Sequence, residues 1–172
     1  MAKPTTGTRP PTPEVRVRVY LAAPLFTLNQ RRANRGLAAL LEKELPGAEV
    51  ILPQDFKVSG KYNDRKNYRE LFRLCLQAIE RADAVVAVLD GADADSGVSF
   101  EVGYAYARRV PIVGVRTDYR AGQDRGVNVM LSQAAGRFVF DMAFREDPAT
   151  LARDVAVKLR GLLSRRGKGG EA

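Results

Sequence analysis

Short apolar runs alternate with longer amphipathic stretches along this chain, and that alternation limits its possible folds more than any other feature. The runs with the length and composition of buried strands are 15–20, 48–52, 84–89, 111–115 and 137–140. Between them, apolar residues recur at helical spacing, as at Leu37, Leu40 and Leu41. Strands and helices in this order favour a parallel sheet covered by helices on both faces. We therefore predict an α/β, doubly wound fold of the Rossmann or flavodoxin-like type, with about five strands.

The length of 172 residues suits a single domain, which we assign to residues 15–164. Residues 1–14 are expected to form a flexible arm, and residues 165–172 a flexible basic tail. The N-terminal stretch lacks the apolar core of a signal peptide, and no apolar run is long enough to cross a bilayer. One cysteine, Cys75, excludes an internal disulfide framework. These features predict a cytoplasmic protein with no membrane partner.

The chain contains no histidine, which excludes several kinds of chemistry. Catalysis by Ser-His-Asp or Cys-His groups and histidine metal sites are ruled out, and one cysteine cannot build a structural zinc site. The net charge of +8 suggests nucleic-acid binding, but part of that excess lies in the C-terminal tail, and basic and aromatic residues do not interleave. Nucleic acid is therefore an unlikely partner, and carboxylates, tyrosines or lysines must carry any catalysis.

An acidic, glycine-containing loop follows the apolar run at 84–89 and leads into a helical pattern from Val98 onward. Asp95 lies in this loop, and Glu101 lies in the first turns of the helix. The carboxyl ends of strands are where open α/β sheets bind ligands. We therefore expect Asp95 and Glu101 to face a pocket beside the N–H groups that begin the helix.

Two interpretations of this carboxylate pair stay open on spacing alone. In one, Glu101 is a nucleophile and Asp95 an acid or electrostatic partner, as in retaining glycoside chemistry. In the other, Asp95 caps the helix and Glu101 only favours the positive end of the helix dipole.

A calcium loop of the EF-hand type is excluded because its ligands are missing. Ala92 and Ala94 occupy the third and fifth positions of such a loop. We therefore expect no metal.

The ends of two further strands, at 20–26 and 53–56, lie on the same predicted rim. Together the three strand ends offer a phenol, an amide, carboxylates and apolar side chains. Such a mixture suits a small ligand that is partly planar and partly polyhydroxylated.

Three segments of this chain resemble the nucleoside 2-deoxyribosyltransferases. They are Tyr20-Leu-Ala-Ala-Pro-Leu-Phe, Asp95-Ser-Gly-Val-Ser-Phe-Glu-Val-Gly-Tyr-Ala and Val127-Asn-Val-Met-Leu. The similarity extends over residues 17–140 or so. It implies transfer of 2-deoxyribose between nucleobases through a covalent deoxyribosyl-enzyme intermediate. Deoxynucleosides and nucleobases are then the small-molecule partners, and we expect no cofactor.

The resemblance assigns roles to the catalytic candidates. Glu101 matches the nucleophile that attacks the anomeric carbon, and Asp95 matches a carboxylate that contacts the sugar. Tyr20 matches a tyrosine whose hydroxyl orients the nucleophile. A phenol that donates to a carboxylate also lowers its pKa, so Tyr20 is expected to keep Glu101 ionised.

The resemblance also implies a set of substrate-binding residues. Asn128 matches a sugar-binding amide supplied by a neighbouring subunit, with Met130 beside it, which implies a homo-oligomer. The remaining candidates are two residues that pack on the base, two at the position of base-edge contacts, and a glycine of the acidic loop, namely Leu25, Phe26, Gln54, Asp55 and Gly97.

One position departs from the family pattern. Cys75 stands where family members commonly carry an aspartate that helps to protonate the leaving base. Asp95, Asp55 or water could take that role instead. From its place on an apolar helix face, Cys75 is expected to be a small core residue rather than a catalytic thiol.

Two other functions compete with base exchange. Related N-hydrolases cleave deoxynucleoside monophosphates, but they tend to have serines where Asp95 and Asn128 stand here, and a carboxylate at the first position would repel a phosphate. The other competitor is a catalytically silent nucleoside- or nucleotide-binding module, because a fold does not fix a function. The presence of Glu101, Asp95, Tyr20 and Asn128 together favours an enzyme.

Overall fold

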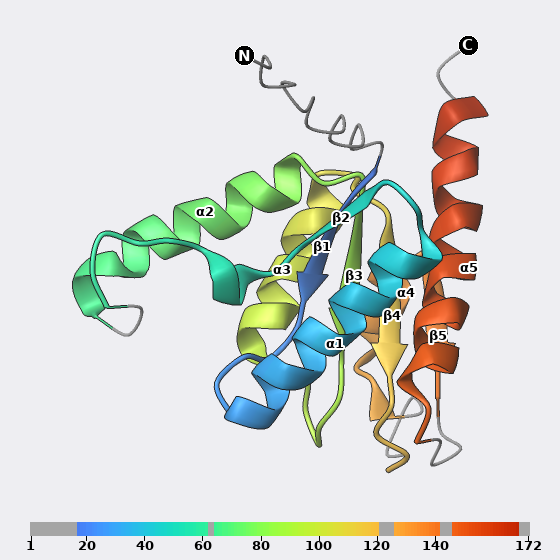
Figure 1. Cartoon of the computed structure of the whole chain (residues 1–172), viewed down its shortest axis with the longest axis horizontal. Helices are drawn as coiled ribbons and strands as arrows, with labels where there is room; N and C mark the ends of the chain where they lie inside the picture. Colours follow the sequence, from blue (N-terminus) through green and yellow to red (C-terminus); the bar gives the residue numbers. More distant parts are fainter. Residues whose placement is uncertain (1–16, 62–63, 121–125, 142–145, 169–172) are drawn as a thin grey trace, which may run out of the picture.

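The computed structural model describes residues 17–61, 64–120, 126–141 and 146–168, with side chains described as far as residue 164. The arm expected at residues 1–14 lies outside these ranges. Within them, the strands β1 (Val17–Ala22), β2 (Ala48–Ile51), β3 (Ala84–Val88), β4 (Ile112–Arg116) and β5 (Arg137–Phe140) form one parallel sheet in the order β2-β1-β3-β4-β5 (Figure 1). This order is that of the flavodoxin-like doubly wound fold, so the predicted fold class is confirmed.

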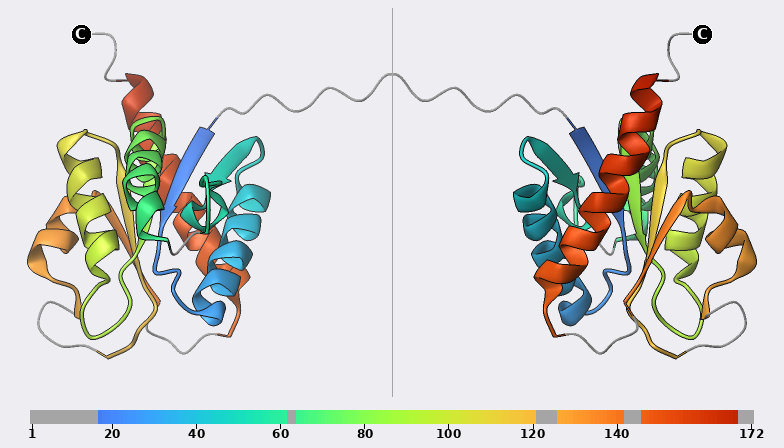
Figure 2. Two further views of the ribbon diagram at one scale, coloured as in Figure 1. Left: turned by 90° about the vertical axis from the view of Figure 1, so that its left-hand side faces the viewer. Right: turned by 90° about the vertical axis from the view of Figure 1, so that its right-hand side faces the viewer.

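Helices cover both faces of the sheet, as Figure 2 shows. The elements α1 (Leu28–Glu44) and α5 (Pro148–Lys168) bury one face in a core with β1 and β4. The elements α2 (Tyr68–Glu80), α3 (Ser96–Ala107) and α4 (Val129–Ala134) cover the other face. Helix α5 extends to Lys168, into the segment that we assigned to the tail. None of the helices in the described ranges is long and apolar enough to cross a membrane.

The turns that begin these helices lie at the carboxyl edge of the sheet. Thr27 and Gln30 form a reciprocal capping box at the start of α1. The Asp95 side chain accepts a hydrogen bond from the Val98 N–H at 3.0 Å and so caps α3, and Asn128 caps α4 through the Met130 N–H at 2.9 Å. A short 3-10 turn at Pro53–Asp55 follows β2, and another at Arg65–Asn67 precedes α2.

The switch point of the sheet lies between β1 and β3, because the chain winds in opposite directions on either side of it. Tyr20 pairs in register with Ile51 of β2 and Val85 of β3. Its side chain belongs to the core under α2 and α3. A residue near the end of β1 therefore points toward the start of α3, where the predicted site lies.

Candidate active site

Tyr20 and Glu101 form the centre of the site. The Tyr20 hydroxyl donates a hydrogen bond of 2.6 Å to Glu101 Oε1. The phenol ring is fully buried in the sheet, and Glu101 is partly buried on the first turns of α3. The strand and the helix hold their backbones in fixed positions, so the carboxylate is oriented by a rigid donor.

Burial controls the charge of this pair. It raises the pKa of Glu101 to about 7, and the charge of Asp95 acts in the same direction, against the hydrogen bond from Tyr20, which lowers that pKa. Tyr20 thus lowers the pKa of Glu101, as we expected, but desolvation raises that pKa by more. Burial, with the neighbouring Glu101 charge, also raises the pKa of Tyr20 far above its usual value, so the phenol stays protonated and remains a donor.

Cys75 on α2 lies close enough to this pair to affect the pKa of both groups. Burial raises the pKa of its thiol to about 11. The thiol is therefore neutral at physiological pH, and its proximity lowers the pKa of Glu101. We expected Cys75 to be a core residue, but it is only partly buried and lines the same cavity as Glu101. Helical spacing predicts that Cys75 lies on the apolar face of its helix, but it does not reveal which residues that face packs against.

Alkylation of Cys75 is expected to be slow. With a pKa of about 11 in place of 9.0, the thiolate fraction near pH 7.5 falls about 100-fold, and iodoacetamide should react slower by that factor than with an ordinary thiol. Where modification does occur, the added group enters the cavity and should block activity. Intact mass and activity followed over the same time course measure both, with Cys75→Ser as the reagent control. Rapid alkylation, or full alkylation with no loss of activity, would contradict this placement.

A cavity of about 170 Å³ opens beside Glu101. Five of the predicted residues line it, namely Leu25, Phe26, Asp95, Gly97 and Glu101. Apart from the two carboxylates, the other described lining residues are uncharged. The arrangement combines an apolar wall suited to a planar group with a carboxylate pair suited to a polyhydroxylated one.

The position of Asp95 fits both interpretations that the sequence left open. Its Oδ1 caps α3, while the side chain also lines the cavity with Glu101. Within the described residues, Asp95 Oδ2 makes no hydrogen bond. One oxygen of the carboxylate is therefore fixed by the helix, and the other is available to a ligand.

Two predicted base-binding residues do not line this cavity. Gln54 donates to the Arg31 carbonyl at 3.0 Å and accepts from Asn34 at 3.3 Å. Asp55 forms an exposed bidentate pair with Arg35, at 2.6 and 3.1 Å. Both side chains thus join the turn after β2 to α1. Their position at a strand end was predictable, but their competing partners on α1 were not.

Asn128 and Met130 are exposed at the start of α4 and do not line the cavity either. Met130 is 76% exposed, an unusual state for a large apolar side chain. The Asn128 side chain caps α4 within its own chain.

The part of the chain that holds this site matches a family of known proteins. The model of the family described as nucleoside 2-deoxyribosyltransferase matches residues 19–133, which hold β1, α3, the cavity and Asn128. The chain belongs to the nucleoside 2-deoxyribosyltransferase family. Membership confirms the resemblance seen in the three sequence motifs, and this family is one of enzymes that act on nucleosides.

Individual proteins are similar to this chain in sequence or in fold. An uncharacterized protein of Ureaplasma parvum is 27% identical over 122 residues, 64% of this chain and 76% of that protein. A 2-deoxyribosyltransferase from Bacillus psychrosaccharolyticus superposes with a TM-score of 0.64 and 19% identity, over 83% of this chain and 95% of that chain. A CMP N-glycosidase from Clostridium botulinum has a TM-score of 0.51 and 18% identity, over 80% and 97%.

Proposed function

We propose that this protein exchanges nucleobases on 2′-deoxyribonucleosides, with Glu101 as the nucleophile. The observation that carries the proposal is the Tyr20–Glu101 hydrogen bond of 2.6 Å at the edge of a small cavity. A buried carboxylate with a protonated phenol as its partner is a suitable nucleophile for an anomeric carbon. Family membership supports the same chemistry.

The proposed reaction has two displacements. The Glu101 carboxylate attacks the anomeric carbon of the sugar while the bond from that carbon to the base breaks, and the base leaves with the bonding electrons and takes up a proton. A second base then attacks the same carbon and loses its proton, which restores a glycosidic bond and releases the Glu101 carboxylate. Tyr20 orients Glu101 throughout, and Asp95 contacts the sugar from the N-terminus of α3.

The charges at the cavity favour a nucleoside over a nucleotide. Both charged side chains among its described lining residues, Asp95 and Glu101, are carboxylates. A phosphate bound beside them would be repelled at short range in a site of low dielectric constant. An uncharged nucleoside avoids this cost.

Two candidates for the group that protonates the leaving base are disfavoured by their surroundings. Asp55 pairs with Arg35 away from the cavity, which argues against it. The Cys75 thiol has a pKa of about 11 and is a weak acid for this purpose. Asp95 or a water molecule therefore remains for the role.

We further propose that the enzyme works as a homo-oligomer. Aromatic side chains on α2 and α3 are half exposed, and Phe72 and Phe100 lie with ring centroids 5.7 Å apart. This surface adjoins a second hollow that is lined by Phe72, Phe100 and Glu101 and so reaches the nucleophile. A second copy seated there would bury the aromatic rings and close the site, and Asn128, exposed on α4, could then serve the neighbouring cavity.

Base exchange can be tested directly. Incubation with deoxyinosine and adenine, followed by chromatography, should yield deoxyadenosine together with hypoxanthine. Release of hypoxanthine with free deoxyribose and no deoxyadenosine would instead indicate an N-glycosidase. No product from deoxyinosine, with other bases and with the 5′-monophosphate also inert, would contradict an enzymatic function and favour the binding module.

A further inference from the structure

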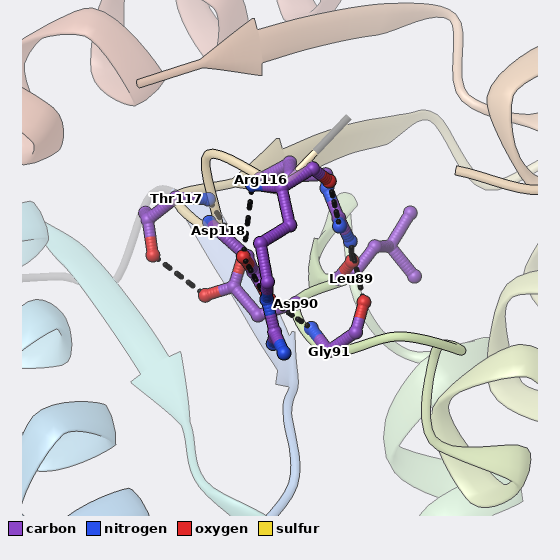
Figure 3. Close-up of polar contacts among 7 residues, drawn as sticks. Leu89, Asp90, Gly91, Arg116, Thr117 and Asp118 are labelled. Carbon is purple, nitrogen blue, oxygen red and sulfur yellow. Dashed lines mark hydrogen bonds and ion pairs between the residues drawn. The ribbon is translucent and has the colours of Figure 1, made fainter. Parts of the chain in front are cut away.

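The loop between β3 and α3 carries Asp95, and within the described part of the chain its residues 90–94 make no backbone–backbone hydrogen bond with one another. After Asp90 the chain turns through Gly91, whose φ of +107° is a conformation that favours glycine. Within the described residues, the hydrogen bonds that join residues 89–91 to the loop after β4 involve Arg116, Thr117 and Asp118 (Figure 3). The position of this loop therefore depends on the end of the neighbouring strand.

Arg116 supplies the central contacts. Its Nη1 donates to the carbonyl oxygens of Leu89 at 2.7 Å and Gly91 at 3.1 Å, and its Nη2 donates to the Arg120 carbonyl at 3.0 Å. The side chain is only 1% exposed. One planar guanidinium thus joins the loop that leads to Asp95 with the loop that follows β4.

Asp90 completes the connection in the opposite direction. Its carboxylate accepts from the Thr117 N–H and hydroxyl, both at 2.6 Å, and from the Asp118 N–H at 3.0 Å. Asp118 in turn accepts from the Gly91 N–H at 3.2 Å. The two loops are therefore tied by charge-assisted hydrogen bonds from both sides, which are stronger than bonds between neutral groups.

Arg116 also packs against the segment that leads to Asn128. Gly126 has a φ of +81°, and a Cβ atom there would lie 2.6 Å from Arg116 Nη2 and 2.7 Å from the Arg120 carbonyl oxygen. Any side chain at this position would displace the guanidinium or the backbone. The conformation of residues 126–128 is thus matched to the position of Arg116.

Burial of an arginine such as Arg116 costs folding free energy, so stability alone does not explain it. The neighbouring β4 residues are apolar or glycine, and Arg116 Nε has no hydrogen-bond partner in the described part of the chain. Among the described residues, its hydrogen-bond partners are backbone carbonyls rather than a carboxylate, so the charge is only partly compensated there. An apolar residue would serve the core at least as well, which indicates a role in placing the loops.

We propose that Arg116 and Asp90 are positioning residues that hold Asp95, and the segment before Asn128, in the geometry needed for deoxyribosyl transfer. This inference rests on the proposed function in naming the reaction. Neither residue lines the cavity beside Glu101. Both act through the loops that they join.

Three variants test the connection from separate ends, namely Arg116→Met, Asp90→Asn and Gly126→Ala. Asp93→Asn is the matched control, because Asp93 lies exposed on the same loop and makes no hydrogen bond within the described residues. Displacement of the loop by about 1 Å should lower kcat by 10- to 100-fold in each of the three variants. Asp93→Asn should retain the parent rate. Should Arg116→Met fail to fold, Asp90→Asn and Gly126→Ala still decide the question.

Two readouts separate positioning from a loss of overall stability. Amide hydrogen exchange should become faster in residues 89–98 and 126–131 while α5 stays protected as in the parent. The acidic limb of the pH–rate profile should move to lower pH, because the charge of Asp95 raises the pKa of Glu101 and a displaced Asp95 does so less. Parent-like kcat and parent-like amide hydrogen exchange in Asp90→Asn and Gly126→Ala would overturn the proposal, as would faster amide hydrogen exchange throughout the chain.

If the parent does not catalyse base exchange, the proposed function fails. The pattern of amide hydrogen exchange alone then still tests whether these residues hold the loops.

Discussion

Replacement of Glu101 by glutamine is expected to abolish base exchange, with a fall in kcat of about 1,000-fold or more, while the fold stays intact. The amide has nearly the shape of the carboxylate and can still accept the Tyr20 hydrogen bond, but it is not a nucleophile toward an anomeric carbon. Steady-state rates, with circular dichroism as the check on folding, measure this. Activity within tenfold of the parent would contradict the assignment of the nucleophile.

The same variant should be more stable than the parent, by an amount that grows as the pH rises. The pKa of Glu101 is about 7 in the folded protein against 4.5 for a fully solvated glutamate, so the folded state binds this proton more tightly than the unfolded state. Between these two values, stability is lost as the pH rises and the buried carboxylate ionises, and the loss is complete above pH 7 at about 3 kcal/mol. Glu101→Gln removes the loss. Urea unfolding should therefore show a larger gain in the free energy of unfolding at pH 8 than at pH 5, and equal gains would contradict the buried state of Glu101.

Tyr20→Phe is expected to shift the pH dependence of catalysis upward. The hydrogen bond from the Tyr20 hydroxyl lowers the pKa of Glu101, so its removal should raise that pKa further above 7. A charge-assisted bond of about 1.5–3 kcal/mol corresponds to a shift of about one to two pH units. The acidic limb of the kcat/KM profile should move by that amount.

The limiting rate of Tyr20→Phe at high pH should also fall, by about tenfold, because Glu101 loses the donor that orients it. The phenyl ring preserves the packing of Tyr20, so the unfolding midpoint at about pH 5, where Glu101 is protonated in the folded state, serves as the control. A profile that keeps its acidic limb, or moves it to lower pH, would contradict the role of the hydrogen bond. The upward shift expected for Tyr20→Phe is opposite in direction to the shift expected for Asp90→Asn, so the two variants can be told apart.

Part of this site was predictable from the sequence because parallel topology determines it. Tyr20 and Glu101 are 81 positions apart, but each lies at the carboxyl edge of neighbouring elements, and strand order brings them together. The capping geometry of Asp95 was predictable for a similar reason, since it depends on residues three positions away.

Other features depend on partners that spacing does not reveal. Gln54 and Asp55 lie at the predicted strand end, yet their side chains bind Arg31, Asn34 and Arg35 on α1. The predicted fourth strand ends at residue 115, but β4 also includes Arg116, which is buried. Charged side chains are usually exposed, and the backbone carbonyls of the adjacent loop, which accept hydrogen bonds from Arg116, explain why a guanidinium is accommodated there.

Mass spectrometry of the enzyme itself tests the central claim most directly. Enzyme mixed with excess deoxyinosine and no acceptor base, quenched in acid within a few turnovers and digested, should carry one deoxyribosyl group on the peptide that contains Glu101. The adduct should disappear on addition of adenine, as deoxyadenosine forms, and be absent from Glu101→Gln. Base exchange that proceeds with no adduct, or with an adduct on a different peptide, would contradict Glu101 as the covalent nucleophile.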